Sequence, residues 1–218
     1  MTDPKIAFFD LDKTILECNS ANLWVKRELK LGHLSYFQFI ESMYWLMLYH
    51  AGKADVRTFL NKASGWVTGA PEAEIIQRTT DFWKEEVRSQ IRPKAVEAIE
   101  RHRKQGDLIV LLTSSSNYLS PLAADVLNIP HILCNRLIAK DGIMTGEMAN
   151  PLCFGDGKSI HAKQFAEKIN MSWKDSYFYT DSYSDHPFML EIDHPIAVTP
   201  DKRLRKMAKQ KGWDILEW

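Results

Sequence analysis

The stretch that decides the fold is residues 6–14, IAFFDLDKT, an apolar run that leads into two aspartates separated by one leucine. Such a short apolar run, bounded by polar residues, predicts a buried β-strand. Side chains alternate along an extended chain, so we expect Asp10 and Asp12 to point the same way while Leu11 points into the protein. A turn with capping aspartates is the alternative for this segment alone, because Asp is common in turns.

Four further apolar runs predict strands later in the chain, at 108–112, 132–134, 177–179 and 196–198. Helical patterns lie between them, at about 93–105, 118–127, 158–170 and 200–211. The alternation predicts an α/β fold, a Rossmann-like parallel sheet of about five strands with helices on both faces. Residues 136–148 predict a hairpin, because Asp141-Gly142 separates two short extended runs.

The segment 18–90 interrupts this alternation because it has helical patterns throughout. Four helices are expected in it, at 20–31, 34–51, 55–66 and 71–89. We therefore predict an α/β core of residues 1–17 and 91–218, with an all-helical cap of residues 18–90 inserted after the first strand. The stretch 36–50, YFQFIESMYWLMLYH, predicts the core helix of a small bundle. The alternative is a surface that meets a lipid-like substrate or a partner protein.

The bulk composition excludes several classes of protein. Lys plus Arg equals Asp plus Glu, at 28 each, so the basic excess of a nucleic-acid binder is absent. The three cysteines are widely spaced and show no zinc or redox motif. No run of about 18 apolar residues and no signal-peptide pattern occurs. We expect a cytoplasmic protein with no nucleic-acid partner and no stable membrane insertion.

A second pair of carboxylates, Asp181 and Asp185, follows the strand expected at 177–179. Ligands of open α/β sheets bind at the carboxyl ends of the strands, so both acidic pairs are expected at one edge. Two unit charges ~4 Å apart repel by about 4 kcal/mol at an effective dielectric of about 20. Such a cluster needs a cation or raised pKa values, and an all-oxygen ligand set suits Mg²⁺.

Hydroxyl groups and one lysine complete the candidate site. Thr113 and Ser114 follow the strand expected at 108–112, where hydroxyls and backbone N–H groups can hold phosphate oxygens. A Ser-rich loop that caps the next helix is the alternative. Lys158 opens a helical pattern, and it would supply the positive charge that a carboxylate and phosphate cluster needs. A solvated surface lysine is the plainer interpretation.

These residues together resemble the signatures of the haloacid dehalogenase superfamily. The segments FFDLDKT and LIVLLTSS resemble the first two, and Lys158 fits the third, 23 residues before Asp181. The segment YTDSYSDHPFM resembles the fourth, an acidic pair. The helical cap, DGIMTGEM and HPIAVTPDKRLRKMAKQKGW are similar to subfamily IB hydrolases that resemble phosphoserine phosphatase.

The resemblance implies a role for each matching position. Asp10 would be the nucleophile that forms an aspartyl-phosphate, and Asp12 the general acid and then base. Thr113 and the backbone N–H of Ser114 would hold the phosphoryl oxygens, and Lys158 would neutralise charge. Mg²⁺ would bind Asp10, the backbone carbonyl of Asp12 and Asp181, with Asp185 close by or bridging through water.

Two positions depart from the pattern of the family. Thr180 stands where a glycine usually precedes Asp181, so its side chain is expected to crowd the backbone there. Asn19 stands where phosphoserine enzymes carry a glutamate that binds the substrate's amino group. For the cap's usual arginine, the candidates are Arg57 and Lys62.

The expected function is hydrolysis of a small phosphorylated metabolite, such as phosphoserine or histidinol phosphate. The alternatives are a phosphotransferase, a lipid-phosphate phosphatase and a non-catalytic binding protein that keeps the fold. A carbon–halogen hydrolase is disfavoured, because dehalogenases generally lack the second aspartate.

Overall fold

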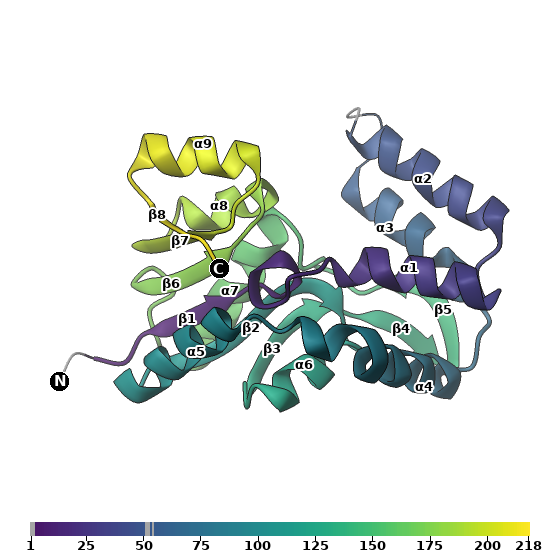
Figure 1. Ribbon diagram of the computed structural model, residues 1–218, viewed down its shortest axis with the longest axis horizontal. Coiled ribbons are helices and arrows are strands. Elements are labelled where there is room, and N and C mark those ends of the chain that lie inside the picture. Colours follow the sequence, from purple (N-terminus) through teal and green to yellow (C-terminus); the bar gives the residue numbers. More distant parts are fainter. Residues whose placement is uncertain (1–2, 51–52, 54) are drawn as a thin grey trace.

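A single six-stranded parallel sheet forms the centre of the molecule (Figure 1). The computed structural model describes residues 3–50, 53 and 55–218. The strands follow the order β3-β2-β1-β6-β7-β8, and their bounds are β1 (Ile6–Phe9), β2 (Leu108–Ser116), β3 (His131–Asn135), β6 (Ser176–Thr180), β7 (His194–Val198) and β8 (Asp214–Leu216). The α/β class is confirmed, but the expected number of five strands is one too low. The missed strand, β8, is an edge strand of three residues, too short to show a pattern.

Helices cover both faces of the sheet, which explains why β1 is buried along its whole length. One face packs against α5 (Pro93–Gln105) and α6 (Ser120–Val126) through Phe9, Leu111 and their neighbours. The other face packs against α7 (Asp156–Lys168), α8 (His186–Met189) and α9 (Lys202–Lys211) through Phe8, Phe178 and their neighbours. The two cores lie on either side of the sheet, so the strands are apolar on both faces.

A helical cap lies beside the sheet, between β1 and β2 in the chain (Figure 1). After an irregular turn, η1 (Leu11–Ile15), it comprises α1 (Ser20–Leu31), α2 (Tyr36–His50), α3 (Val56–Ser64), η2 (Gly65–Val67), α4 (Glu72–Phe82), η3 (Trp83–Val87) and η4 (Arg88–Gln90). The two chain segments that connect the cap to the core run side by side and are hydrogen-bonded to each other. Glu17 N–H donates to the Gln90 carbonyl at 2.8 Å, and Arg92 N–H donates to the Ile15 carbonyl at 2.8 Å.

The predicted hairpin forms as β4 (Leu137–Lys140) and β5 (Ile143–Met148), and it packs against the cap. Gly69 N–H donates to the Met144 carbonyl at 2.9 Å, and Met144 N–H donates to the Ala70 carbonyl at 2.9 Å. The hairpin therefore adds a β-layer to the helices, although it follows β3 in the chain. The division of the chain into a core of 1–17 and 91–218 and a cap of 18–90 stays a prediction.

Helix α2 is not the buried core of a bundle, so that prediction is wrong. Six of its large apolar side chains are between 42% and 77% exposed: Tyr36, Phe37, Ile40, Met43, Tyr44 and Met47. Its main packing partner is α3, with fewer contacts to α1, and two neighbours cannot cover a helix that is apolar nearly all round. Among the described residues, no helix has the length and apolarity needed to cross a bilayer.

Candidate active site

The carboxyl ends of β2, β1 and β6 lie side by side, because these strands are adjacent in the sheet. Phe9 is in register with Leu111 on one side and Tyr179 on the other. Asp10 directly follows β1, and its N–H donates to the Tyr179 carbonyl at 2.9 Å. The residues after all three strands thus meet at one edge of the sheet, as the sequence predicted.

Lys158 is buried within this edge, in the first turn of α7, with an exposed fraction of 2%. Its Nζ lies 2.9 Å from Oδ1 of Asp10 and 2.7 Å from Oδ2 of Asp185. The Thr180 hydroxyl donates to the same Asp185 oxygen at 2.6 Å. The alternative interpretation of Lys158, a solvated surface lysine, is therefore wrong. Asp10 and Asp185 are 175 positions apart along the chain, and the fold brings both carboxylates to Lys158.

Burial dominates the electrostatics of the site. It raises the pKa of Asp10 to about 6, although Lys158 opposes the shift. It also raises the pKa of Asp181 to about 7, with a further contribution from the negative charge of Asp10. Burial alone would lower the pKa of Lys158, but the charges of Asp10 and Asp185 outweigh it and raise that pKa. Lys158 thus contacts two carboxylates, and Asp181 adds a third nearby, which leaves an excess of negative charge.

This donor set fits Mg²⁺. Among the described residues, no three acidic, His or Cys side chains gather into a metal cluster of their own. Mg²⁺ does not need one, since it keeps several waters and binds through one or two carboxylates together with substrate phosphate. Asp10 and Asp181 supply two such carboxylates. Asp185 is turned toward Lys158 and Thr180 instead, so its direct neighbours are the lysine and a hydroxyl.

The Asp12 carboxylate is held by the first helix of the cap. Its Oδ1 accepts a hydrogen bond from Ser20 N–H, at the start of α1, at 2.9 Å. Lys13 has a φ of 56°, and this left-handed residue makes the turn that follows Asp12. Burial raises the pKa of Asp12, and its hydrogen bond to Ser20 opposes the shift. A carboxyl with a raised pKa at a helix N-terminus is suited to hold and release a proton.

The hydroxyl-bearing carboxyl end of β2 is held in place by a side-chain amide. Thr113 is buried, and its Oγ1 accepts from Ser115 N–H at 3.1 Å. The Ser114 hydroxyl donates to the Cys153 carbonyl at 2.8 Å, so it is committed within the protein. The Asn135 amide donates to the Ser114 carbonyl at 2.8 Å and accepts from Cys153 N–H at 2.7 Å. Sequence reasoning missed Asn135, because an asparagine at a strand end carries no signal of a bridge between two loops.

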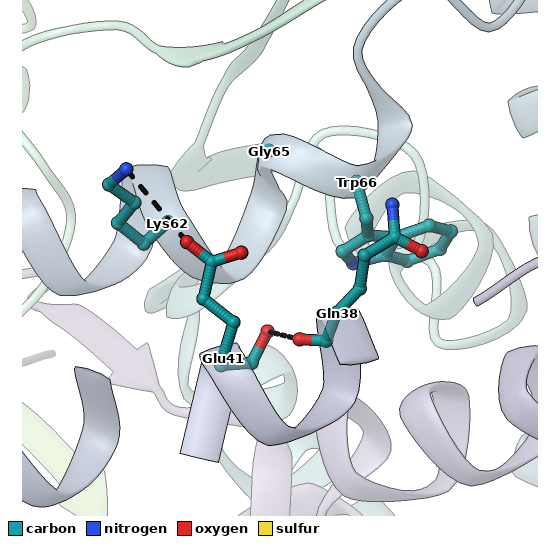
Figure 2. Close-up of a pocket in the computed structure, with 6 residues that line it drawn as sticks. Gln38, Glu41, Lys62, Gly65 and Trp66 are labelled. Atoms are coloured by element: carbon teal, nitrogen blue, oxygen red, sulfur yellow. Dashed lines mark hydrogen bonds and ion pairs between the residues drawn. The ribbon is translucent and has the colours of Figure 1, made fainter. Parts of the chain in front are cut away.

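The cap residues proposed from the sequence lie in other surroundings. The Asn19 side chain accepts from Asn22 N–H at 2.9 Å and thereby caps α1. Lys62 lies 4.0 Å from Glu41 across a hollow between α2 and α3 (Figure 2), and Arg57 is exposed. A mostly buried cation of the cap is instead Arg78 of α4, whose side chain is 13% exposed and pairs with buried Glu28.

Arg78 was missed because nothing in its polar surroundings in the sequence marks it as buried. Its guanidinium contacts two neighbouring indole rings, 5.8 Å from the ring centre of Trp24 and 5.7 Å from that of Trp66. Arginine stacked on aromatic faces keeps its charge while its stem packs like an apolar side chain.

Comparisons with known proteins agree with this geometry. Residues 7–190 match the family model of haloacid dehalogenase-like hydrolases. A probable phosphatase of Mycobacterium tuberculosis (strain ATCC 25618 / H37Rv) is 30% identical over 220 residues, covering 97% of this chain and 75% of the relative. A histidinol-phosphatase of Neisseria meningitidis serogroup C (strain 8013) is 26% identical over 218 residues, covering 98% of each chain.

A solved structure, a phospho-aspartyl intermediate analogue of phosphoserine phosphatase, has the same fold, with a TM-score of 0.72 and 17% identity over 99% of this chain and 94% of the other. The resemblance seen in four short motifs is confirmed by a family match that spans most of the chain. Its parallel sheet, its acidic strand ends and its buried lysine all agree with that match. The chain belongs to the haloacid dehalogenase-like hydrolase family and is one of its phosphatases.

Proposed function

We propose that this phosphatase hydrolyses a small phosphomonoester with Mg²⁺ bound, through an aspartyl-phosphate on Asp10. The observation that supports it most is the position of Lys158 Nζ, 2.9 Å from Asp10 in a buried acidic cluster. A carboxylate that attacks a phosphate is an anion approaching an anion, so catalysis depends on neutralising both. A buried lysine in contact with the attacking group offsets part of that repulsion.

The reaction has two steps on this proposal. In the first, an oxygen of Asp10 forms a bond to phosphorus while the bond to the leaving alcohol breaks, and Asp12 gives that alcohol its proton. In the second, Asp12 takes a proton from a water that attacks the phosphorus, and Asp10 is released with inorganic phosphate. The hydrogen bond from Ser20 N–H to Asp12 holds this carboxyl in one orientation for both transfers.

Three groups would hold Mg²⁺: the carboxylates of Asp10 and Asp181 and the backbone carbonyl of Asp12. The ion would supply positive charge to the phosphoryl oxygens. Thr113 and the backbone N–H of Ser114 would bind those oxygens from the other side. Asp185 would act through Lys158, since it contacts that ammonium at 2.7 Å.

The substrate proposed is a small phosphorylated metabolite, with histidinol phosphate and phosphoserine as the first candidates. The Neisseria meningitidis relative and the phosphoserine phosphatase structure support these two. Asn19 caps α1, so the glutamate that binds the substrate's amino group in phosphoserine enzymes has no counterpart at this position, which argues against the phosphoserine mode of recognition.

The test is a screen of phosphomonoesters with Mg²⁺ present and then chelated, using wild type and Asp10→Asn. We expect phosphate release that depends on Mg²⁺ and falls at least ~1,000-fold in Asp10→Asn, because an amide cannot serve as the nucleophile. Unchanged turnover in a folded Asp10→Asn protein would remove this residue from the mechanism. Adding alcohol acceptors separates hydrolysis from phosphotransfer, since a transferase would form new phosphate esters in preference to inorganic phosphate.

A further inference from the structure

The outer side of α2 is an exposed apolar surface, which we call the outer stripe. It consists of Tyr36, Phe37, Ile40, Met43, Tyr44 and Met47. Their spacing of three and four residues places most of them along one side of the helix. No charged side chain belongs to this set. Contiguous exposed apolar surface of this kind marks an interaction site in a soluble domain.

The polar residues of α2 lie on the opposite side of the helix, which faces α3, and the Glu41 side chain is 43% exposed there. Gln38, Glu41 and Ser42 line the hollow between α2 and α3, where Glu41 faces Lys62 (Figure 2). An ordinary surface helix turns its apolar side inward and its charges to water. This helix does the reverse over much of its length, so packing within the monomer does not explain its apolar residues.

Basic side chains lie beyond both ends of the outer stripe. Lys30 is exposed in the last turn of α1, just before α2 begins, and Lys53 is exposed after α2, where its N–H donates to the Leu48 carbonyl at 2.9 Å. Two more exposed cations lie on the neighbouring helices, Lys26 on α1 and Arg57 on α3. The segment 18–67 contains six Lys or Arg and three Asp or Glu, in a chain whose net charge is zero.

The acidic residues of this segment offset only part of that charge. Glu28 is buried and pairs with Arg78, whereas Asp55 is exposed at the N-cap of α3 and remains charged. Glu41 points into the hollow toward Lys62. The exposed cations thus give the outer face of the cap a local positive charge.

We propose that the outer stripe docks the cap onto the surface of an anionic lipid bilayer. Phe, Met and Tyr side chains bury an apolar body at the headgroup boundary while the tyrosine hydroxyls stay in water, and lysines attract anionic headgroups. A second copy of the chain fits less well, because a two-fold contact would place the cations near one outer stripe against the same cations of the other copy. This docking is independent of the chemistry at Asp10.

The experiment is co-sedimentation of the full chain with vesicles of phosphatidylglycerol and phosphatidylcholine, and with vesicles of phosphatidylcholine alone. We expect wild type to bind the anionic vesicles at least about tenfold more tightly than the neutral ones. The double variant Phe37→Ser/Ile40→Ser should weaken that binding at least about tenfold, because it removes two apolar side chains from the stripe. Lys30→Glu/Lys53→Glu should weaken it by about tenfold or more.

Two controls separate docking from other effects. Ile160→Ser/Leu190→Ser removes two exposed apolar side chains of the core, and Asp10→Asn removes the nucleophile; both should bind vesicles as wild type does. Absence of binding to anionic vesicles, or equal binding to neutral ones, overturns the proposal. Light scattering that finds a dimer lost in Phe37→Ser/Ile40→Ser, without vesicle binding, overturns it in favour of a second copy.

Discussion

At the scale of single residues, the site depends on one ammonium shared between two carboxylates. Lys158 contacts Asp10 at 2.9 Å and Asp185 at 2.7 Å, and all three side chains are buried. Removal of one partner from a buried ion pair leaves an uncompensated charge, which costs more than the pair itself contributes. The lysine is therefore structural as well as chemical.

Replacement of this lysine by methionine tests that double role. We expect Lys158→Met to lower the free energy of unfolding by about 3–5 kcal/mol near neutral pH, because Asp10 and Asp185 lose their shared cation. Asp10 already has its pKa raised to about 6, so protonation at lower pH should reduce the loss. Urea unfolding at about pH 8 and about pH 5.5 measures both effects.

A matched control lies on the same helix. Lys163 pairs with Glu191 at 2.7 Å, and its side chain is 34% exposed. Lys163→Met should change the free energy of unfolding by less than about 1 kcal/mol, because an ion pair near the surface contributes little. If Lys158→Met were as stable as Lys163→Met at both pH values, the buried cluster would not hold the charges we assign to it.

Thr180 departs from the family's sequence pattern, and the structure shows what its side chain contacts. From the sequence, a side chain in place of glycine suggested crowding before Asp181. The structure instead directs its hydroxyl to Asp185 at 2.6 Å, so the departure adds a hydrogen bond beside the lysine. Which residues gather at this edge of the sheet was predictable from four short motifs. Which atoms they contact was not, because contacts between Thr180, Asp185 and Lys158 depend on how β6 and α7 are packed.

At the scale of elements, the start of α7 determines where Lys158 lies. Gly157 precedes the lysine, and a Cβ built on it would lie 1.8 Å from the Leu152 carbonyl oxygen. That backbone atom cannot move without shifting the loop that Asn135 and Ser114 hold through Cys153. The glycine thus permits a close approach that brings α7 to the edge of the sheet.

Gly157→Ala should displace this helix start and misplace the ammonium. We expect kcat to fall by roughly 10- to 100-fold, since a misplacement of about 1 Å in a catalytic group has effects of that size. Steady-state phosphate release at saturating substrate measures it. Gly212→Ala is the control: that glycine has a φ of 70° and open space around it, so alanine should cost about 1 kcal/mol of stability without lowering kcat. Equal kcat values in the two variants would show that the contact with Leu152 does not position Lys158.

Helix ends were predictable where the sequence marks them. The predicted bounds of α5 agree with the structure because Pro93 stands at the first helical position and Gly106, with a φ of 83°, ends it. The bounds of β2 were not predictable, since Thr113 to Ser116 extend the strand beyond the apolar run of 108–112. The inward polar side of α2 could not be predicted either, because its composition favoured burial all round.

At the scale of the whole molecule, one buried histidine links helix, strand and loop away from the site. His102 of α5 is 2% exposed; its Nδ1 lies 2.7 Å from Asp107, before β2, and its Nε2 lies 2.8 Å from the Tyr179 hydroxyl of β6. Burial lowers the pKa of His102 below 6.5, and the hydrogen bond to Asp107 opposes the shift. Unfolding therefore releases a histidine that binds a proton more readily.

The sign of the resulting pH dependence follows from linkage. Below about pH 6.5 the unfolded chain takes up a proton that the folded chain does not, so this group lowers stability as pH falls until its folded pKa is reached. We expect His102→Gln to remove that contribution. Because Asp10 and Asp181, with raised pKa values, act in the opposite direction, the quantity to measure is the difference between wild type and variant.

Urea unfolding across about pH 5 to 8 gives that difference. The free energy of wild type relative to His102→Gln should decrease on acidification, by up to about 1.4 kcal/mol per pH unit for one proton. Two curves that run parallel over this interval would mean that His102 titrates alike in the folded and unfolded chains.

The paired chain segments at the base of the cap have a consequence for how the enzyme admits its substrate. The backbone N–H groups of Glu17 and Arg92 each donate a hydrogen bond from one segment to the other, and Leu16 forms a β-bridge with Ile91. The two connections therefore cannot twist independently. A cap joined to its core by two connections that are bonded to each other rotates about a single hinge axis. Because α1 begins beside these connections and donates to Asp12, each rotation displaces the proton-transferring carboxyl together with the cap. Opening of the cap for substrate exchange would then also move the Asp12 acid out of its catalytic position.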